Sequence, residues 1–457
     1  MTRADRSRRD AERAADEAAK EVYQAILSRN PEHDFEPTLD RVRAVCDLLG
    51  DPQKAFRTVH VTGTNGKTST ARMIDRLVRE HGLRTGRFTS PHLTSPRERI
   101  AIDGEPISAE RFVDIWQDVA PYVHMVDTRS AAEGGPRMSF FEVLTVMAFA
   151  AFADAPIDVA IIEVGMGGGW DATNVVDGEV AVVAPISLDH ERWLGHDLIS
   201  IAGEKAGIIK DGASVVLARQ TEDVEGVLLA AAAARGARVV REGVDIDVTE
   251  RTVAVGGQLI SLRGLGGIYT EVFLPLYGAH QAHNALLALV ATEALLTGGA
   301  ALDGDVVGAA FADVDSPGRL EVLRSSPTII VDAAHNPAGI EALVSGVEEA
   351  FEFTRLVGVV GVLQDKDAES VLAGLEPLLA EVVVTRSSSP RSFEVADLED
   401  IANEVFGEDR VHAVERLDDA LDLAVALAEG EEQYGAGVLV TGSITMVADL
   451  RILLGRG

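Results

Sequence analysis

A glycine-rich segment at residues 62–69 (TGTNGKTS) follows a β-branched run at residues 57–61 and precedes an amphipathic stretch. This order suits a phosphate group, because small residues let backbone N–H groups approach it and a helix N-terminus adds partial positive charge. Lys67 is placed to reach the β- and γ-phosphates of a nucleotide, and Thr68 to lie beside its Mg²⁺. A plain glycine turn is the alternative, since Val61 stands where the full phosphate-loop pattern has its first glycine. With ATP as the expected ligand, the predicted nucleotide-binding residues here are Gly63, Thr64, Asn65, Gly66, Lys67, Thr68 and Ser69.

Polar residues also follow three further β-branched runs. Glu163 ends the run at 158–163, the run at 180–186 leads to His190, and residues 87–89 lead to Ser90. Because the carboxyl ends of parallel strands meet at one edge of a sheet, we expect these side chains to converge beside the glycine-rich segment. A carboxylate there suits Mg²⁺, which prefers oxygen ligands.

Each of these residues also has an ordinary interpretation when it is taken alone. Glu163 is then a strand-end acid, His190 a hydrogen-bonded structural histidine and Ser90 a turn residue before proline. Lys205, within GEKAG at 203–207, is an exposed lysine at a helix end. Only their joint placement at neighbouring strand ends favours a functional interpretation.

The elements that would position these residues alternate between β-branched runs and Ala/Leu-rich stretches from residue 57 onward. That alternation predicts an α/β fold with a mainly parallel sheet. A helix is expected over residues 69–81, where apolar residues form one stripe before Gly82. Residues 236–272, rich in Gly and Val, predict β-hairpins or loops before a helix that begins near His283.

The string DVDSPGR at residues 313–319 interrupts this pattern, and a second series of strands and helices starts at residue 328. We therefore expect four segments. They are a charged, solvated and partly helical N-terminal extension over 1–40, a P-loop ATPase-like domain over 41–315, a hinge linker over 316–320 and a smaller Rossmann-like α/β domain over 321–457.

The composition excludes several classes of function. Lys and Arg number 41 against 73 Asp and Glu, a net charge of −32 that repels nucleic-acid backbones and anionic lipid. No apolar run reaches the roughly 20 residues that a membrane-spanning helix needs. The first 20 residues fit neither a signal peptide nor a transit peptide, and the single Cys46 cannot form an internal disulfide. We therefore expect no nucleic-acid or membrane partner and a cytoplasmic location.

In sequence order, the motifs resemble those of the folylpolyglutamate synthase and dihydrofolate synthase family of the Mur ligase superfamily. In the first domain the match is carried by TGTNGKTS at 62–69, TSPHL at 89–93, ERI at 98–100, FFE at 140–142, EVG at 163–165, DATN at 171–174, SLDH at 187–190 and GEKAG at 203–207. In the second it is carried by PGR at 317–319, DAAHNP at 332–337, DKD at 365–367 and TGS at 441–443. Ala333 stands where the family usually has glycine.

The resemblance implies ATP-dependent joining of L-glutamate to folate, and also to dihydropteroate, through an acyl phosphate. It makes the first domain ATP- and folate-binding and the second a glutamate ligase C-terminal domain, in a protein expected to be a monomer. Ser90, Glu163 and Thr68 then resemble ligands of one Mg²⁺, and His190 of a second. Lys205 resembles a lysine that becomes an N-carboxylated carbamate.

The same resemblance extends to further residues with expected roles. The residues expected to act in catalysis are Lys67, His190 and Lys205. Those that resemble adenine, phosphate and ribose ligands are Asn284, Arg319, Asp332 and His335. The substrate-binding candidates are Phe140, Asp171, Ala172, Arg99 and Ser443.

Two other functions remain as alternatives. A Mur-type ligase would add an amino acid to a cell-wall precursor, but such enzymes carry a UDP-sugar domain before the P-loop, and only residues 1–61 precede it here. A regulator could bind ATP without ligase chemistry. The intact set of Lys67, Ser90, Glu163, His190 and Lys205 favours the ligase over that regulator.

Overall fold

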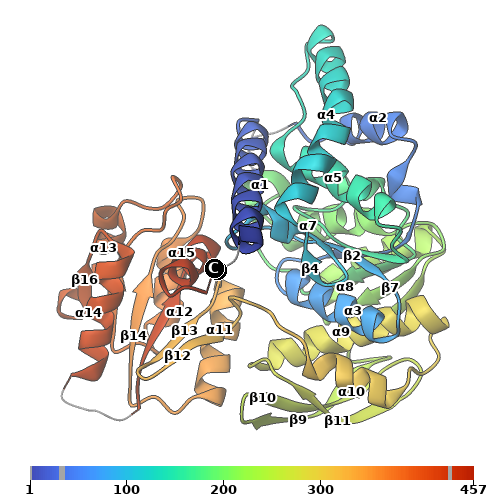
Figure 1. Cartoon of the computed structure of the whole chain (residues 1–457). Helices are drawn as coiled ribbons and strands as arrows, with labels where there is room; N and C mark the ends of the chain where they lie inside the picture. The colour runs from blue at the N-terminus through green and yellow to red at the C-terminus, as the bar shows by residue number, and fades with distance from the viewer. Residues whose placement is uncertain (1–2, 30–35, 431–434, 457) are drawn as a thin grey trace. The chain divides into compact units, whose positions relative to one another are not determined.

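The computed structural model describes residues 3–29, 36–430 and 435–456. Their packing forms two compact units (Figure 1). The first contains the chain up to Thr249 with Leu262–Thr270 and Asn284–Phe311, and the second contains Glu250–Ser261, Glu271–His283 and the chain from Ala312. The expected linker at 316–320 thus lies inside the second unit, and its role as a hinge stays a prediction.

The first unit is built on a sheet with the strand order β4-β3-β2-β5-β1-β6-β7-β8. Strands from β2 to β8 in this order are parallel, whereas β3 and β4 are antiparallel additions at one edge. This confirms the expected α/β fold with a mainly parallel sheet. The strands are β1 Arg57–Thr62, β2 Thr85–Phe88, β3 Ile100–Ile102, β4 Glu105–Pro106, β5 Val159–Glu163, β6 Val180–Val183, β7 Ser214–Leu217 and β8 Arg238–Arg241.

Helices precede, follow and connect these strands. They are α1 Arg3–Leu27, α2 Asp40–Leu48, α3 Lys67–Glu80, α4 Ala109–Ala132, α5 Phe140–Asp154, α6 Glu191–Leu194, α7 Leu198–Lys205, α8 Glu222–Ala234, α9 Ala279–Thr297 and α10 Gly304–Ala312. Short 3₁₀ helices are η1 Pro52–Lys54, η2 Pro96–Arg99, η3 Ala172–Val175 and η4 Ala206–Ile208. Helix α3 begins at Lys67, inside the glycine-rich segment, and α9 begins before the expected His283. None of the helices in the described part of the chain is long and apolar enough to cross a lipid bilayer.

The expectation of a solvated N-terminal extension is wrong for helix α1. Its C-terminal half packs along α4 (Figure 1), and Ala19 and Ile26 are buried in the hydrophobic cluster that α4 and α5 share. Val22 and Tyr23 pack against the same cluster. The cause is the spacing of these four residues, which places them on one face of a helix whose other residues are largely charged.

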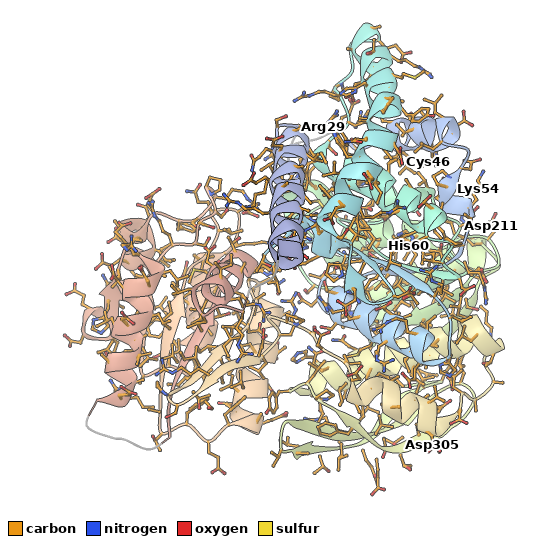
Figure 2. The ribbon with its side chains drawn as sticks, in the orientation of Figure 1. Arg29, Cys46, Lys54, His60, Asp211 and Asp305 are labelled. Atoms are coloured by element: carbon orange, nitrogen blue, oxygen red, sulfur yellow. The ribbon has the colours of Figure 1, made fainter. Side chains whose placement is uncertain are left out.

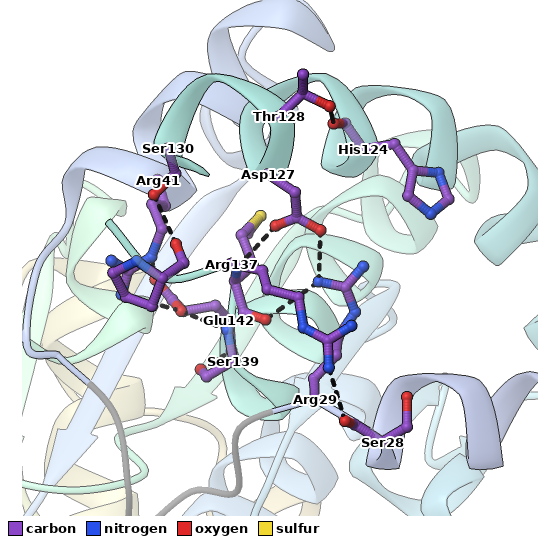
Figure 3. A network of polar contacts seen from close by, with 12 residues as sticks. Ser28, Arg29, Arg41, His124, Asp127, Thr128, Ser130, Arg137, Ser139 and Glu142 are labelled. Atoms are coloured by element: carbon purple, nitrogen blue, oxygen red, sulfur yellow. Dashed lines mark hydrogen bonds and ion pairs between the residues drawn. The ribbon is translucent and has the colours of Figure 1, made fainter. Parts of the chain in front are cut away.

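Two ion pairs, one buried and one partly buried, tie the N-terminal segment to the same helices (Figure 3). Arg29 Nη1 donates to Asp127 Oδ2 at 2.8 Å and to the carbonyl of Met138 at 3.1 Å. Arg41 of α2 donates to both carboxylate oxygens of Glu142, at 3.0 and 3.3 Å. Because a buried charge is costly unless it is paired, removing one partner of such a pair is strongly destabilising.

The second unit is built on a sheet with the order β12-β13-β17-β14-β15-β16, parallel except for β12. Its strands are β12 Glu321–Ser325, β13 Thr328–Val331, β14 Arg355–Val360, β15 Glu381–Val384, β16 Val411–Ala413 and β17 Ala436–Thr441. Its helices are α11 Pro337–Ala350, α12 Ala368–Leu375, α13 Val395–Phe406, the 3₁₀ helix η5 Glu408–Arg410, α14 Leu417–Glu429 and α15 Ile444–Leu453. A further sheet, β11-β10-β9, comes from β9 Asp247–Ala254, β10 Gly257–Arg263 and β11 Ile268–Leu274, where hairpins or loops were expected.

Candidate active site

The glycine-rich segment forms a tight loop between β1 and α3. Gly63 has φ +141°, and a Cβ atom at this residue would lie 2.7 Å from the Cβ of Ala184. Lys67 Nζ donates to the carbonyl oxygens of Gly63 and Thr64, at 3.1 and 3.0 Å. The N–H of Thr64 donates to the carbonyl of Pro185, just beyond β6, at 2.9 Å. Glycine is therefore required here both for the backbone angle and for the approach of the neighbouring strand.

Three of the predicted metal ligands lie together beside this loop. Thr68 Oγ1 lies 2.9 and 3.0 Å from the two carboxylate oxygens of Glu163, within hydrogen-bond distance of both. The backbone N–H of Ser90 lies 3.4 Å from Glu163 Oε2. The sheet explains this arrangement, because β5 lies between β1 and β2, and Val61 pairs with Glu163.

Lys205, at the end of α7, reaches the same loop from a distant part of the sequence. Its Nζ donates to the carbonyl of Gly63 at 2.8 Å, so Lys67 and Lys205 share one acceptor. Burial, followed by the positive charge of Lys67, lowers the pKa of Lys205 to about 7, against the opposing effect of nearby carboxylates such as Asp189. Near pH 7, the amine of Lys205 is therefore neutral in a substantial fraction of the molecules.

A pocket opens beside these lysines, with about 250 Å³ of space that includes open solvent. Gly63, Thr64, Lys67, Lys205 and His190 line it together with the glycine-rich turn after β5. The imidazole of His190 is partly exposed, and its Nε2 lies 4.0 Å from Asp189 Oδ2. The backbone of His190 is left-handed, with φ +53°. The structure thus brings the three residues expected to act in catalysis into one pocket.

Asn284 is the one predicted nucleotide ligand of the first unit that lies outside residues 62–69. It is buried, and its side-chain oxygen would lie 2.5 Å from a Cβ atom at Gly66. The amide of Asn284 therefore lies directly against the phosphate loop, although α9 follows the loop by more than 200 residues.

The other predicted nucleotide ligands lie in the second unit. Asp332 is buried and accepts hydrogen bonds from the N–H groups of Leu320 and Ala334, both at 2.7 Å. Burial raises the pKa of Asp332, while Arg319 opposes that shift. The ring of His335 contacts the carbonyl of its neighbour Ala333 through Nδ1, at 2.8 Å.

Two details of this region concern Ala333 and Ser443. Ala333 is not among the described residues with positive φ, so its backbone does not need the glycine that is usual in the resembling family. Ser443 begins α15 as its N-cap and accepts a hydrogen bond from the N–H of Met446 at 3.2 Å. The role of Ser443 in substrate binding stays a prediction.

The substrate-binding candidates of the first unit form two groups. In one, the guanidinium of Arg99 lies 5.1 Å from the ring centroid of Phe140 and its Nε donates to His92 Nδ1 at 2.9 Å. Tyr23 contacts both His92 and Phe140 edge-on. Burial, followed by the charge of Arg99, lowers the pKa of His92 to about 3, so this ring is neutral.

Asp171 belongs to the second group. It is buried and accepts hydrogen bonds from the N–H of Met166 and from the N–H and hydroxyl of Thr173, at 2.9, 2.9 and 2.5 Å. Burial raises the pKa of Asp171 to about 6, although these hydrogen bonds act in the opposite direction. Ala172, the next residue, is buried in the hydrophobic cluster that also contains Phe140.

Sequence reasoning did not select several residues that the structure places at these groups. Tyr23 was missed because the N-terminal segment was expected to be solvated, although its helical apolar stripe was a usable signal. Thr173 lies within the DATN motif but was assigned no role. His60 lies between Val59 and Val61 in a strand whose residues after Arg57 are all buried, which is the pattern of a buried polar group with a specific partner.

Comparisons with known proteins agree with this architecture. A family model described as the Mur ligase glutamate ligase domain matches residues 318–444. The chain is 50% identical over 456 residues to the dihydrofolate synthase/folylpolyglutamate synthase of Mycobacterium tuberculosis, which covers 95% of this chain and 94% of that protein.

Solved structures show the same relationship. Folylpolyglutamate synthase of Mycobacterium tuberculosis, complexed with ADP and AMPPCP, matches with a TM-score of 0.92 and 50% identity, covering 96% of this chain and 99% of that chain. Escherichia coli FolC, in complex with DHPP and ADP, matches with a TM-score of 0.81 and 28% identity. The match covers 96% of this chain and 97% of that chain. The chain therefore belongs to the dihydrofolate synthase/folylpolyglutamate synthase family, and its residues 318–444 match the Mur ligase glutamate ligase domain.

Proposed function

We propose that this protein is an ATP-dependent ligase that joins L-glutamate to a folate, and also to dihydropteroate, by an amide bond. The observation that carries the proposal is the meeting of Lys67, Lys205 and the Thr68–Glu163 pair at one phosphate loop. Attack of a carboxylate on a triphosphate joins two anions, so the site must supply positive charge and backbone donors. A chain with a net charge of −32 can supply them only locally.

The donor set beside the loop fits Mg²⁺. The described residues hold no cluster of three or more His, Cys, Asp or Glu side chains that could bind a metal alone, but Mg²⁺ commonly uses one or two carboxylates with substrate phosphates and water. Glu163, Thr68 and Ser90 would hold one ion, and His190 would contribute to a second. When bound, the ions would neutralise the phosphate oxygens during transfer.

The reaction proceeds in two displacements. A carboxylate oxygen of the folate attacks the γ-phosphorus of ATP, the bond to the β–γ bridging oxygen breaks, and ADP leaves. The neutral amine of glutamate then attacks the acyl carbon, gives up a proton, and expels inorganic phosphate. Lys67 and the N–H groups at the start of α3 stabilise the charge that develops on the transferred group.

Lys205 is proposed to carry a carbamate in the active enzyme. The ammonium group first loses a proton, and the neutral amine then attacks CO₂, forms a C–N bond and releases a second proton. The side chain thereby changes from a cation to an anion able to bind a metal ion. The lowered pKa of Lys205, about 7 and caused mainly by burial, supports this step because only the neutral amine is nucleophilic.

The remaining site residues have proposed binding roles. Phe140, Ala172, Asp171 and Arg99 contact the folate or dihydropteroate, and Ser443 contributes to substrate binding in the second unit. In the first unit the proposed nucleotide ligands are residues 62–69 and Asn284, and in the second unit they are Arg319, Asp332 and His335. A monomer in a reducing cytoplasm is also proposed; the single Cys46, buried, is consistent with such a compartment.

One assay tests the reaction. ADP release is measured with MgATP and glutamate while the acceptor is dihydropteroate, tetrahydrofolate or a muramyl nucleotide. Release that depends on glutamate and on either of the first two acceptors is expected. Activity only with the muramyl nucleotide would favour a cell-wall ligase, and no acceptor-dependent release would leave an ATP-binding regulator.

A further inference from the structure

His60 is a histidine buried in the first unit, on β1 two residues before the phosphate loop (Figure 2). Its Nε2 lies 2.9 Å from the hydroxyl oxygen of Thr173, and its Nδ1 is buried without a hydrogen-bond partner. Burial, followed by the charge of Lys210, lowers the pKa of His60 to about 3. The ring is therefore neutral and carries a single N–H.

The direction of each hydrogen bond follows from the number of protons. An ionised carboxylate only accepts, so the single hydroxyl proton of Thr173 is donated to Asp171 Oδ1, at 2.5 Å. The same hydroxyl oxygen must then accept from His60, which requires the proton of His60 to be on Nε2. His60, Thr173 and Asp171 thus form one directed chain, which we call the His60 chain.

The His60 chain ends on a carboxylate that also organises the pocket wall. Asp171 Oδ2 accepts from the N–H of Met166, which lines the pocket beside Lys67 and Lys205. Thr62 binds the neighbouring Gly167 carbonyl directly, at 2.8 Å. Strand β1 therefore supports this wall twice, once through Thr62 and once through the His60 chain.

We propose that His60 and Thr173 are positioning residues that hold Asp171 in the orientation and ionised form needed to receive the pteridine end of the substrate. The inference rests on the proposed role of Asp171 in substrate binding. It adds His60 and Thr173, which have no role in the proposed function. Neither positioning residue contacts the substrate. Their effect is transmitted by the orientation and protonation of one carboxylate.

The geometry gives a sign for the pH dependence. A hydrogen bond to the ionised form lowers the pKa of a carboxyl group, so losing the Thr173 hydroxyl raises the pKa of Asp171. Charged groups that interact with the His60 chain include Lys210, which lowers the pKa of His60, and Lys205, whose own pKa is raised by Asp171. Both stay in place in the variants described below.

The main test compares Thr173→Val with Thr173→Ser in the purified full chain. Thr173→Val is expected to raise KM for dihydropteroate or tetrahydrofolate by on the order of ten-fold, because a buried carboxylate loses a donor. It should also move the acid limb of kcat/KM to higher pH, with KM for ATP changed less than about two-fold. Thr173→Ser keeps the hydroxyl, so its KM and its pH profile should remain close to those of the wild type.

A matched control is Thr292→Val, which removes a buried hydroxyl that bonds only the carbonyl of Ala288 in α9, at 2.8 Å. It should leave the acid limb and both KM values unchanged. If Thr173→Val does not fold, His60→Leu against His60→Gln carries the test, because the glutamine amide can donate from the position of Nε2.

A second readout does not depend on activity. In ¹⁵N-histidine-labelled protein, the resonances missing from His60→Gln identify His60, which should be the neutral Nε2–H tautomer from pH 7 to pH 8, where Asp171 is ionised. The Nδ1–H tautomer at neutral pH, or titration of His60 above pH 5, would overturn the proposal.

The variant Asp171→Asn separates the possible failures. If it raises KM for the pteridine substrate while Thr173→Val, Thr173→Ser and the wild type agree, the His60 chain is overturned and the role of Asp171 stands. If Asp171→Asn leaves that KM unchanged, the substrate role of Asp171 fails, and the inference fails with it. If the wild type shows no acceptor-dependent ADP release, the proposed function itself is wrong.

Discussion

The phosphate loop and the turn around Asp171 hold their polar groups in opposite ways. In the loop the backbone positions the polar groups. Gly63 and Gly66 have positive φ, and the carbonyl of Gly63 accepts hydrogen bonds from Lys67 and Lys205. At Asp171 a side chain is held in part by another side chain, the Thr173 hydroxyl, which is itself bound by His60 at 113 residues' separation.

This difference determines how each region is broken. The loop tolerates no added atom at Gly63, because the neighbouring strand already lies within contact of where a Cβ would be. The Asp171 turn is sensitive to a removed atom, because each buried hydrogen bond satisfies a group that has no access to water. The clearest effects are therefore expected from substitutions that add atoms in the phosphate loop and from substitutions that remove a hydrogen-bonding group around Asp171.

The largest effect is expected where a side chain meets the loop. Glu163→Ala removes the carboxylate that Thr68 contacts and that is proposed to bind Mg²⁺. Glutamate-dependent ADP release should fall on the order of a thousand-fold or more, because the charge of the transferred phosphate is no longer compensated. Glu179→Ala, which removes a surface acid paired with Arg57, is the control. Near-normal turnover of a folded Glu163→Ala variant would remove Glu163 from the site.

The second largest effect is expected at Lys205, which lies at the end of α7 and donates to the carbonyl of Gly63 in the loop. Lys205→Ala should lower kcat on the order of a hundred-fold, with partial recovery when a short carboxylate such as acetate is added. Wild-type protein treated with ¹³CO₂ should show a carbamate resonance that the variant lacks. Lys54→Ala, at an exposed position, is the control. Full activity of Lys205→Ala without any additive would exclude the carbamate.

The loop and the Asp171 turn also differ in how far the sequence predicted them. Residues 62–69 are contiguous, so their order along the chain already encodes the strand, turn and helix that present Lys67 and Thr68. The approach of Glu163 and Ser90 was also predictable, because both follow strands of one parallel sheet. Here local sequence and general sheet topology are sufficient.

Contacts between distant side chains were not predictable in the same way. The pairing of His60 with Thr173 depends on which face of β1 meets η3, and Tyr23 reaches His92 only because α1 packs on α4. Nor did the order of segments along the chain show that residues 250–261 and 271–283 pack with the second unit. The apolar stripe of α1 shows that the helix packs on something, but these contacts also depend on which elements pack together, and one sequence does not show that.

A third, smaller effect compares the two glycines of the loop. In Gly63→Ala the new Cβ would lie 3.0 Å or less from backbone and side-chain atoms of Ala184, so the backbone itself must move. In Gly66→Ala the close neighbour is the amide end of Asn284, which can rotate away. Gly63→Ala should therefore cost about 2 to 3 kcal/mol of unfolding free energy and Gly66→Ala about 1 kcal/mol. Denaturant unfolding with and without ATP measures both, and equal losses would show that the contact with Ala184 is not decisive.

The pH dependence of stability tests the Asp171 side of the comparison. Burial raises the pKa of Asp171 from an ordinary 3.8 to about 6, so between these pH values the folded chain binds a proton that the unfolded chain has released. Stability then falls as pH rises through this range, by up to about 3 kcal/mol for a shift of this size. Asp171→Asn cannot titrate, so its unfolding free energy should fall less than that of the wild type between pH 4 and pH 6. The substitution also lowers stability at every pH, because the new amide nitrogen would face the N–H of Met166 at one carboxylate position, so the slope with pH is the informative quantity. Parallel pH dependences in the two proteins would mean that the hydrogen bonds from Met166 and Thr173 outweigh burial, and that Asp171 is ionised in the folded protein throughout this range.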